Sequence, residues 1–144
     1  MRIPTDFVLS FLTRRFKSLG INQYELTMGE ELLWGVKNGD LDKVRELIEK
    51  KGCDVNGDLI NGRKPIHFAA DYGQHEMIGY LVSQGANVNL PDKHGITPLL
   101  AAIYEDHMEC VKLLLAKGAD KDGLSPSGES YKDCAESQEM KDLL

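Results

Sequence analysis

The chain has 144 residues, a formal net charge of −6 and a hydrophobic content of 42%, which suits one small domain with a packed apolar core. No apolar run approaches the roughly eighteen residues of a membrane span, and the negative charge argues against nucleic acid and for a basic protein surface as the partner. Three cysteines at irregular spacings are typical of reduced thiols, not of a disulfide framework. We therefore expect no membrane contact and no direct nucleic-acid contact.

Residues 1–27 differ from the rest of the chain. They carry a net charge of +2, which leaves −8 for the remainder, and their apolar stretch at 7–12 is too short for a secretory signal. A weak mitochondrial presequence or a short membrane-touching helix is one interpretation. The simpler interpretation is a poorly ordered extension that precedes a translation start at Met28 and that the fold does not need.

From residue 28 onward, one pattern recurs with a period of about 33 residues. Pro65 recurs as Pro98, and Gly85 recurs as Gly118 at the same offset. The repeats are expected at about 28–58, 59–91 and 92–124, with a partial repeat at 125–144. Because each unit of such an array buries its apolar face only against a neighbour, the two full central repeats need atypical capping repeats at both ends.

The first repeat holds one residue more than the others. The spacing from Trp34 to Phe68 is one residue longer than the spacing from Gly52 to Gly85, although both pairs occupy equivalent places in neighbouring repeats. The simplest place for the extra residue is a lysine within 49–51, at the exposed end of the second helix of this repeat.

Helix and turn signals agree with the period. Thr97 suits the cap of a helix that starts at Pro98, whereas Lys64 is a weaker cap before Pro65. Gly85 and Gly118 are typical of the left-handed position just past a helix end. The segments 61–62 and 92–95 have the residue types typical of turns. Apolar residues recur at helical spacing in the second helix of each central repeat: Met77, Ile78, Leu81 and Val82, then Met108, Val111, Leu114 and Leu115. The predicted fold class is all-α, a solenoid of helix-turn-helix repeats with short β-hairpin fingers.

The Thr-Pro-Leu motif at 97–99 and the Gly-Ala-Asn/Asp motifs at 85–87 and 118–120 resemble the ankyrin-repeat family. The resemblance runs from residue 28 to residue 144 and is weakest at 124–139. The strings at 34–42, 62–65, 69–74, 91–100 and 111–121 further resemble a group of small cytoplasmic and nuclear members of that family. Those members bind the α/β heterodimer of actin capping protein, keep it off filament barbed ends, and have been linked to Rel-family transcription factors and cell growth.

The resemblance implies a monomeric, non-enzymatic regulator in the cytoplasm and the nucleus that binds capping protein and promotes actin filament growth and cell growth. The alternative is a generic adaptor that acts on Rel-family transcription factors in the nucleus. The resemblance also implies a concave face lined by inner helices and hairpin tips. On that face, aromatic rings would supply buried area and carboxylates would steer a basic partner. The predicted partner-binding residues are Trp34, Arg63, Asp71, Tyr72, Lys93, His94, Tyr104 and Glu105. For Trp34, a place in the core of the first repeat stays open, because large aromatic residues are usually mostly buried.

Several residues invite a metal-binding or catalytic interpretation, but their spacing does not support it. The segment 105–110 holds four types of metal ligand, yet no second cluster supplies the remaining ligands of a zinc site, and Cys110 is expected on the core side of a helix. His67 is expected to bond the local backbone, because no nucleophile lies nearby in the sequence. His75 and His94 are expected in exposed turns. We predict no catalytic residue, no cofactor and no metal.

Overall fold

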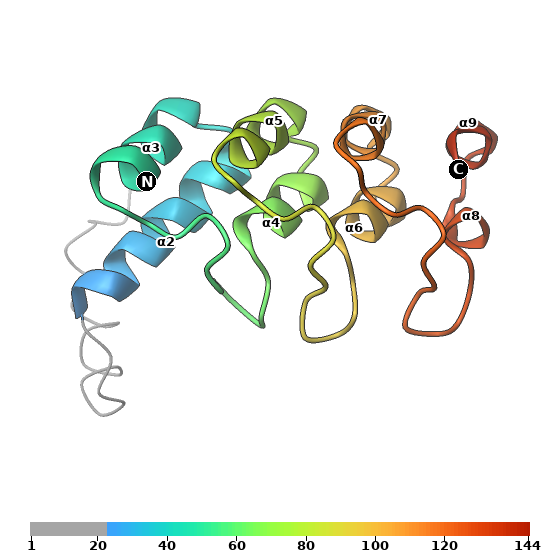
Figure 1. Cartoon of the computed structure of the whole chain (residues 1–144), viewed down its shortest axis with the longest axis horizontal. Coiled ribbons are helices and arrows are strands. Elements are labelled where there is room, and N and C mark those ends of the chain that lie inside the picture. Colours follow the sequence, from blue (N-terminus) through green and yellow to red (C-terminus); the bar gives the residue numbers. More distant parts are fainter. Residues whose placement is uncertain (1–22) are drawn as a thin grey trace, which may run out of the picture.

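The computed structural model describes the backbone from residue 23 to residue 144 and the side chains from residue 28 onward. Over this range the chain forms consecutive helix pairs that stand side by side in one row (Figure 1). The first helices of the pairs, the inner helices, are α2(Gln23–Asn38), α4(Pro65–Asp71), α6(Pro98–Tyr104) and α8(Tyr131–Cys134). The second, the outer helices, are α3(Leu41–Arg45) continued by η2(Glu46–Lys50), α5(His75–Ser83), α7(Met108–Ala116) and α9(Gln138–Leu143). The predicted all-α repeat solenoid is confirmed.

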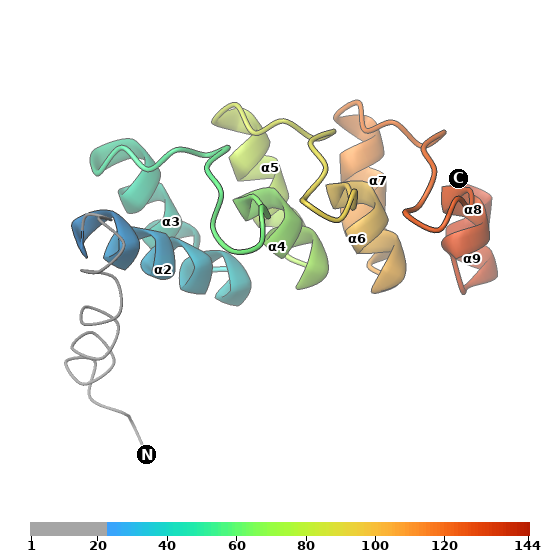
Figure 2. The same cartoon turned by 90° about the horizontal axis from the view of Figure 1, so that it is seen from below.

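Three loops, the fingers, join one pair to the next and project from the side of the inner helices. They comprise residues 56–64 (first finger), 89–97 (second finger) and 122–130 (third finger). Figure 2 looks onto this side, with the fingers and inner helices in front of the outer helices. Asn61 and Gly62 both have positive φ, at 57° and 69°, as the two central residues of a tight hairpin turn require. Between residues 23 and 144, the first and third fingers each hold one isolated antiparallel bridge, Ile60 with Arg63 and Leu124 with Ser130, and no finger contains a longer strand.

The helix starts follow the local chemistry expected from the sequence. The Thr97 hydroxyl accepts a hydrogen bond from the Leu100 amide at 3.2 Å, which satisfies one of the free amides at the start of α6. At the start of α4 the Lys64 side chain makes no such cap. Instead, the Lys64 amide donates to Nδ1 of the His67 ring at 3.0 Å. A side chain inside the helix therefore replaces the missing cap.

The extra residue of the first repeat is absorbed by the π-helical turn η2. The amide of Cys53 bonds the carbonyl of Leu47, six residues back, whereas the equivalent amide of Ala86 bonds Leu81, five residues back. The insertion therefore lies between Leu47 and Gly52, which confirms the predicted place. A single wide turn of this kind is the usual way for a helix to take in one more residue.

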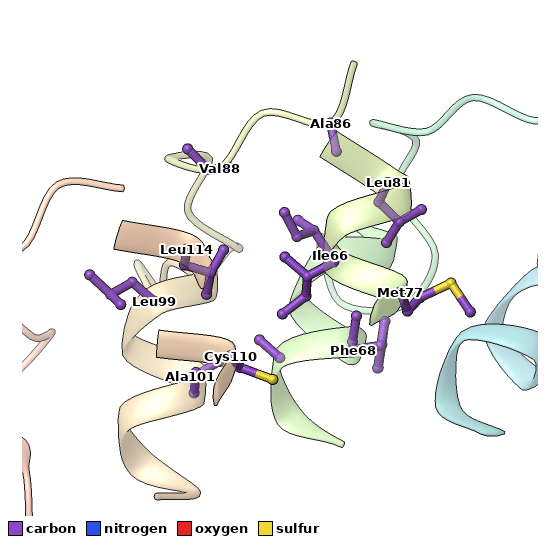
Figure 3. Close-up of a cluster of buried hydrophobic side chains, with 14 of the residues drawn as sticks. Ile66, Phe68, Met77, Leu81, Ala86, Val88, Leu99, Ala101, Cys110 and Leu114 are labelled. Atoms are coloured by element: carbon purple, nitrogen blue, oxygen red, sulfur yellow. The ribbon is translucent and has the colours of Figure 1, made fainter. Parts of the chain in front are cut away.

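The core runs through the row between the inner and outer helices (Figure 3). Ile66 and Leu99 on inner helices and Met77, Leu81 and Leu114 on outer helices are 0–1% exposed. Each such side chain contributes about 1.5–3 kcal/mol relative to an exposed one. Of the apolar residues predicted in the outer helices, Val82, Met108 and Leu115 are only half-buried, because they lie at the margin of the apolar stripe.

Asparagine side chains join each repeat to the next. Asn56 donates to the carbonyl of Gly85 and accepts from the amide of Asn87, both at 2.9 Å. Asn89 makes the same two bonds one repeat further on, to Gly118 at 3.2 Å and from Asp120 at 2.9 Å. These paired bonds satisfy backbone groups at the ends of the outer helices and hold neighbouring repeats in register.

The predicted boundary between residues 27 and 28 falls within α2, which begins at Gln23. Residues 1–22 lie outside the described residues, so the predicted extension stays a prediction. None of the helices from residue 23 onward combines the length and the apolar composition that crossing a bilayer requires.

Candidate protein-interaction site

The large aromatic side chains predicted to bind a partner are exposed. Trp34 on α2 is 57% exposed, Tyr72 directly after α4 is 51% exposed, and Tyr104 at the end of α6 is 45% exposed. The alternative place for Trp34 in the core is therefore wrong. Small residues fill the core beside the tyrosines, since Ala70 and Ala102 are fully buried.

An open groove of about 280 Å³ lies between the first two fingers and the helices α4 and α6. Its lining residues are Asn61, Arg63, Asp71, Asp92, His94, Ile96, Ala101, Tyr104 and Glu105. Five of the predicted partner-binding residues thus meet in one groove, and Trp34, Tyr72 and Lys93 stand outside it. Their contact with a partner stays a prediction.

Arg63 lines this groove and is held there by contacts with neighbouring side chains. Its guanidinium forms a short ion pair with Asp71 and lies 4.9 Å from the centre of the Phe68 ring. Its Nε is 3.5 Å from Asp92, close enough for charge attraction but without hydrogen-bond geometry. Sequence reasoning interpreted Asp92 only as a turn residue and did not predict that it faces Arg63.

Asp92 is 7% exposed, which is unusual for a carboxylate without compensating partners. Its Oδ1 accepts hydrogen bonds from the amides of His94 at 2.8 Å and Ile96 at 3.0 Å. The carboxylate therefore shapes the turn of the second finger. At the tip of that finger, the exposed Lys93 donates to Asn61 of the first finger at 3.0 Å.

Tyr104 and Glu105 stand at the open edge of the groove. Partial burial raises the pKa of Tyr104, and the neighbouring Cys134 thiol of α8 acts in the same direction. The fourth repeat therefore borders the site. Within residues 28–144, no side chain donates a hydrogen bond to the Glu105 carboxylate or forms an ion pair with it, so this charge faces solvent.

Tyr72 lies against a cation of the neighbouring repeat. The ammonium group of Lys37 is 5.4 Å from the centre of the Tyr72 ring and 5.5 Å from that of Phe68. Such contacts are worth about 0.5–1 kcal/mol at exposed sites. The Tyr72 ring therefore has a preferred place, which lowers the entropy that a partner would have to remove on binding.

His67 and Cys110 lie in structural positions. His67 is fully buried; its Nδ1 accepts from Lys64, and its Nε2 donates to the carbonyl of Ile96 at 3.0 Å. Burial, followed by the charge of Arg63, lowers the pKa of His67, which is therefore neutral at pH 7. Cys110 lies on the core side of α7, as predicted, and burial raises its pKa to about 11, which leaves it a poor nucleophile.

His107 is the residue directly before the outer helix α7, and its Nε2 bonds the carbonyl of Asp71 at 2.9 Å. His94 lies in an exposed turn, as predicted, whereas His75 is exposed but is the first residue of α5 and not a turn residue. In the part of the chain that the structure describes, no three His, Cys, Asp or Glu side chains come together in a metal-binding arrangement. The groove presents the aromatic ring of Tyr104 beside the carboxylates of Asp71, Asp92 and Glu105.

Comparison with known proteins agrees with the repeat architecture. A family model described as ankyrin repeats (3 copies) matches residues 32–123. Myotrophin of Xenopus tropicalis is 54% identical over 61 residues, which cover 42% of this chain and 51% of that protein. Myotrophin of Homo sapiens is 56% identical over 45 residues, which cover 31% and 37%. The rice protein named probable E3 ubiquitin-protein ligase XBOS32 is 33% identical over 93 residues, which cover 64% and 19%. The chain thus spans about half the length, or less, of the curated relatives it matches.

Proposed function

The chain belongs to the ankyrin-repeat family and is similar to its myotrophins, and on that premise we propose that it binds the heterodimeric actin capping protein. It acts as a non-enzymatic regulator: by holding the free heterodimer it keeps capping protein off filament barbed ends and promotes filament growth and cell growth. We place this activity in the cytoplasm, with a second pool in the nucleus.

The distribution of exposed apolar side chains carries the proposal. Among the described residues, every large hydrophobic side chain that is exposed lies on an inner helix, at its end, or on a finger: Trp34, Ile60, Tyr72, Tyr104 and Leu124. The outer helices of this same range present none. Exposed aromatic residues on one face are typical of binding surfaces, because their rings bury much area at little entropic cost. That face is therefore the best candidate for partner contact.

Charge supports a basic partner for this face. The chain carries −6 overall, and Glu105, beside Tyr104 in the groove, presents a carboxylate that no side chain of residues 28–144 pairs with. Opposite charges on a partner would speed the encounter, while the aromatic rings would slow dissociation. Such a surface suits sequestration, in which the regulator removes capping protein by mass action and does not act on the filament.

A seeded actin elongation assay tests the proposal. Added alone, the protein should leave barbed-end elongation unchanged. Added together with capping protein, it should restore elongation in proportion to the complex formed. A change in elongation without capping protein would mean a direct activity on actin and would contradict the proposal.

Matched variants test whether the activity depends on the finger side of the molecule. Trp34→Ala combined with Tyr72→Ala should abolish the rescue while the helical circular dichroism signal is kept, because both rings are exposed. The control is Tyr80→Ala on the outer helix α5, which should leave the rescue intact. The Tyr80 hydroxyl bonds Glu49 at 2.9 Å. A pulldown from cytosol that recovers Rel-family transcription factors and no capping protein would favour the alternative adaptor role.

A further inference from the structure

Three carboxylates line the groove, and the chain already supplies a cation to two of them. Arg63 pairs with Asp71 and has its Nε 3.5 Å from Asp92. Its side chain is only 19% exposed, and its guanidinium lies on the Phe68 ring. Of the carboxylates in the groove, Glu105 is the one that this arginine does not reach.

Arg63 joins three separate parts of the fold. It stands at the end of the first finger; Asp71 is the last residue of α4; and Asp92 begins the turn of the second finger. Because Asp92 holds the amides of His94 and Ile96, one guanidinium sets the position of the finger that carries Lys93 and His94.

Because Asp92 is buried, it depends on Arg63 for the compensation of its charge. The Asp92 side chain is only 2% exposed, so removal of Arg63 would leave a buried charge without its cation. Removing one partner of a buried pair is costly, because the remaining charge cannot recover its hydration where it stands. We expect the turn of the second finger to shift toward solvent in that case, which would widen the groove.

We propose that Arg63 is a positioning residue of the partner site. It acts on the partner through Asp92 and the second finger without touching the partner, and it leaves Glu105 as the carboxylate that meets a basic group of the partner. This proposal rests on the proposed function for the identity of the partner, actin capping protein. It assigns to Arg63 a role different from that of Tyr104 and Glu105, which face solvent at the edge of the groove.

A double-mutant cycle with capping protein tests the proposal. Arg63→Gln and Asp92→Asn should each weaken binding about tenfold, and the double variant should also be about tenfold weaker, because both changes remove the same support. Effects that multiply to about a hundredfold would mean that Arg63 contacts the partner itself and would overturn the proposal. Lys64→Gln removes the same charge beside Arg63, from a side chain that pairs with the exposed Asp58, and should stay within about twofold of the wild type.

Amide exchange in the free protein tests the same idea without a partner. In Arg63→Gln, protection of the His94 and Ile96 amides should fall about tenfold, while that of amides in α7 is kept. Arg63→Lys retains the charge but not the planar guanidinium, so its protection at His94 and Ile96 should lie between that of the wild type and that of Arg63→Gln. It replaces Arg63→Gln in this test if the latter loses its circular dichroism signal. Unchanged protection at His94 and Ile96 would overturn the proposal. If the wild-type chain fails to bind capping protein, the proposed function fails, and the exchange measurement still decides the role of Arg63.

Discussion

The imidazole ring of His107 packs against Gly73. Its Nε2 bonds the carbonyl of Asp71 at 2.9 Å, and a Cβ atom on Gly73 would lie 2.9 Å from its Nδ1. The turn between α4 and α5 therefore packs directly beneath the start of α7. Because the ring is held by its hydrogen bond, it has little freedom to move away.

The first prediction is that Gly73→Ala destabilises the protein by about 2–4 kcal/mol. Gly73 has a φ of +70°, which disfavours any residue with a Cβ, and the new methyl group would also meet the His107 ring. Urea unfolding followed by circular dichroism measures the change.

Gly85→Ala is the matched control for this substitution. Gly85 has a φ of +95°, but a Cβ atom at this position would meet no other atom within 4 Å. Only the backbone cost applies there, which we expect to be about 1 kcal/mol. Equal losses for the two variants would mean that the His107 ring yields without cost.

The second prediction concerns the wide turn η2. Deletion of Lys50 should change the free energy of unfolding by less than about 1 kcal/mol, because Lys50 is exposed and the deletion restores the five-residue spacing between Leu47 and Cys53 that the other repeats have. Deletion of Gln84 from the second repeat is the control. It would bring Ala86 to the left-handed position of Gly85, at a cost of about 1 kcal/mol. It would also pull the Asn87 amide out of register with Asn56, so the total loss should be about 2 kcal/mol. A large loss on deletion of Lys50 would show that the wide turn is required for packing.

The third prediction is a pH dependence of stability that comes from His67. Burial, followed by the charge of Arg63, lowers the pKa of His67 in the folded protein, so the unfolded chain binds the proton more tightly. The contribution of His67 is therefore fully present above the unfolded pKa of about 6.5 and is lost as the pH falls through the folded pKa. Unfolding free energies measured from pH 7.5 to pH 5 should fall by at most about 1.4 kcal/mol per pH unit on this account.

His67→Gln isolates this contribution, because an amide can donate and accept hydrogen bonds but does not titrate. The variant should be less stable at pH 7.5 and should show a shallower fall toward pH 5 than the wild type. His94→Gln, at an exposed position, should keep the wild-type slope. If the slope is the same in His67→Gln, other groups cause it.

The fourth prediction separates the roles of Tyr104 and Glu105 in capping-protein binding. Glu105→Lys should mainly slow association, and its effect should shrink as salt is added, because exposed charges are screened beyond about 10 Å at 0.1 M ionic strength. Tyr104→Ala should mainly speed dissociation, because the contact area of the ring is lost. Surface plasmon resonance at two ionic strengths measures both rates.

The control for these rates is Glu109→Lys on the outer helix α7. It makes the same charge change at a side chain that is 65% exposed and paired with Lys112. Both rates should stay close to those of the wild type. A larger effect at Glu109 than at Glu105 and Tyr104 would place the partner on the outer helices.

The sequence was informative wherever structure depends on nearby residues. The cap at Thr97, the turn at 61–62 and the left-handed glycines after the outer helices each depend on bonds across a few residues, and all were found where expected. The regular period of the repeats predicted the order of the helix pairs for the same reason, because each repeat is one local unit. The extra residue could be located within the first repeat from spacing alone.

The candidate site was less accessible to this reasoning, because its contacts join residues that are distant in the sequence. Arg63 and Asp92 lie in successive fingers, and His67 bonds the carbonyl group of Ile96 across the same distance along the chain. The spacing of repeats predicts that such residues come near one another, but not which atoms meet. The eight predicted partner-binding residues therefore included Arg63 and Asp71 without any indication that the two bind each other.

The sequence by itself determined the repeat architecture, the helix starts at Pro65 and Pro98 and most of the apolar stripe of the outer helices, because these follow from periodicity and from short-range hydrogen bonds. Only the tertiary structure decided that Trp34 is exposed, that Arg63 is held by two carboxylates, and that Glu105 is left to face solvent. The physical reason is that exposure and charge pairing depend on how closely neighbouring repeats stack and how far each side chain reaches across them. Those quantities are set by packing in three dimensions and leave no periodic mark on the sequence.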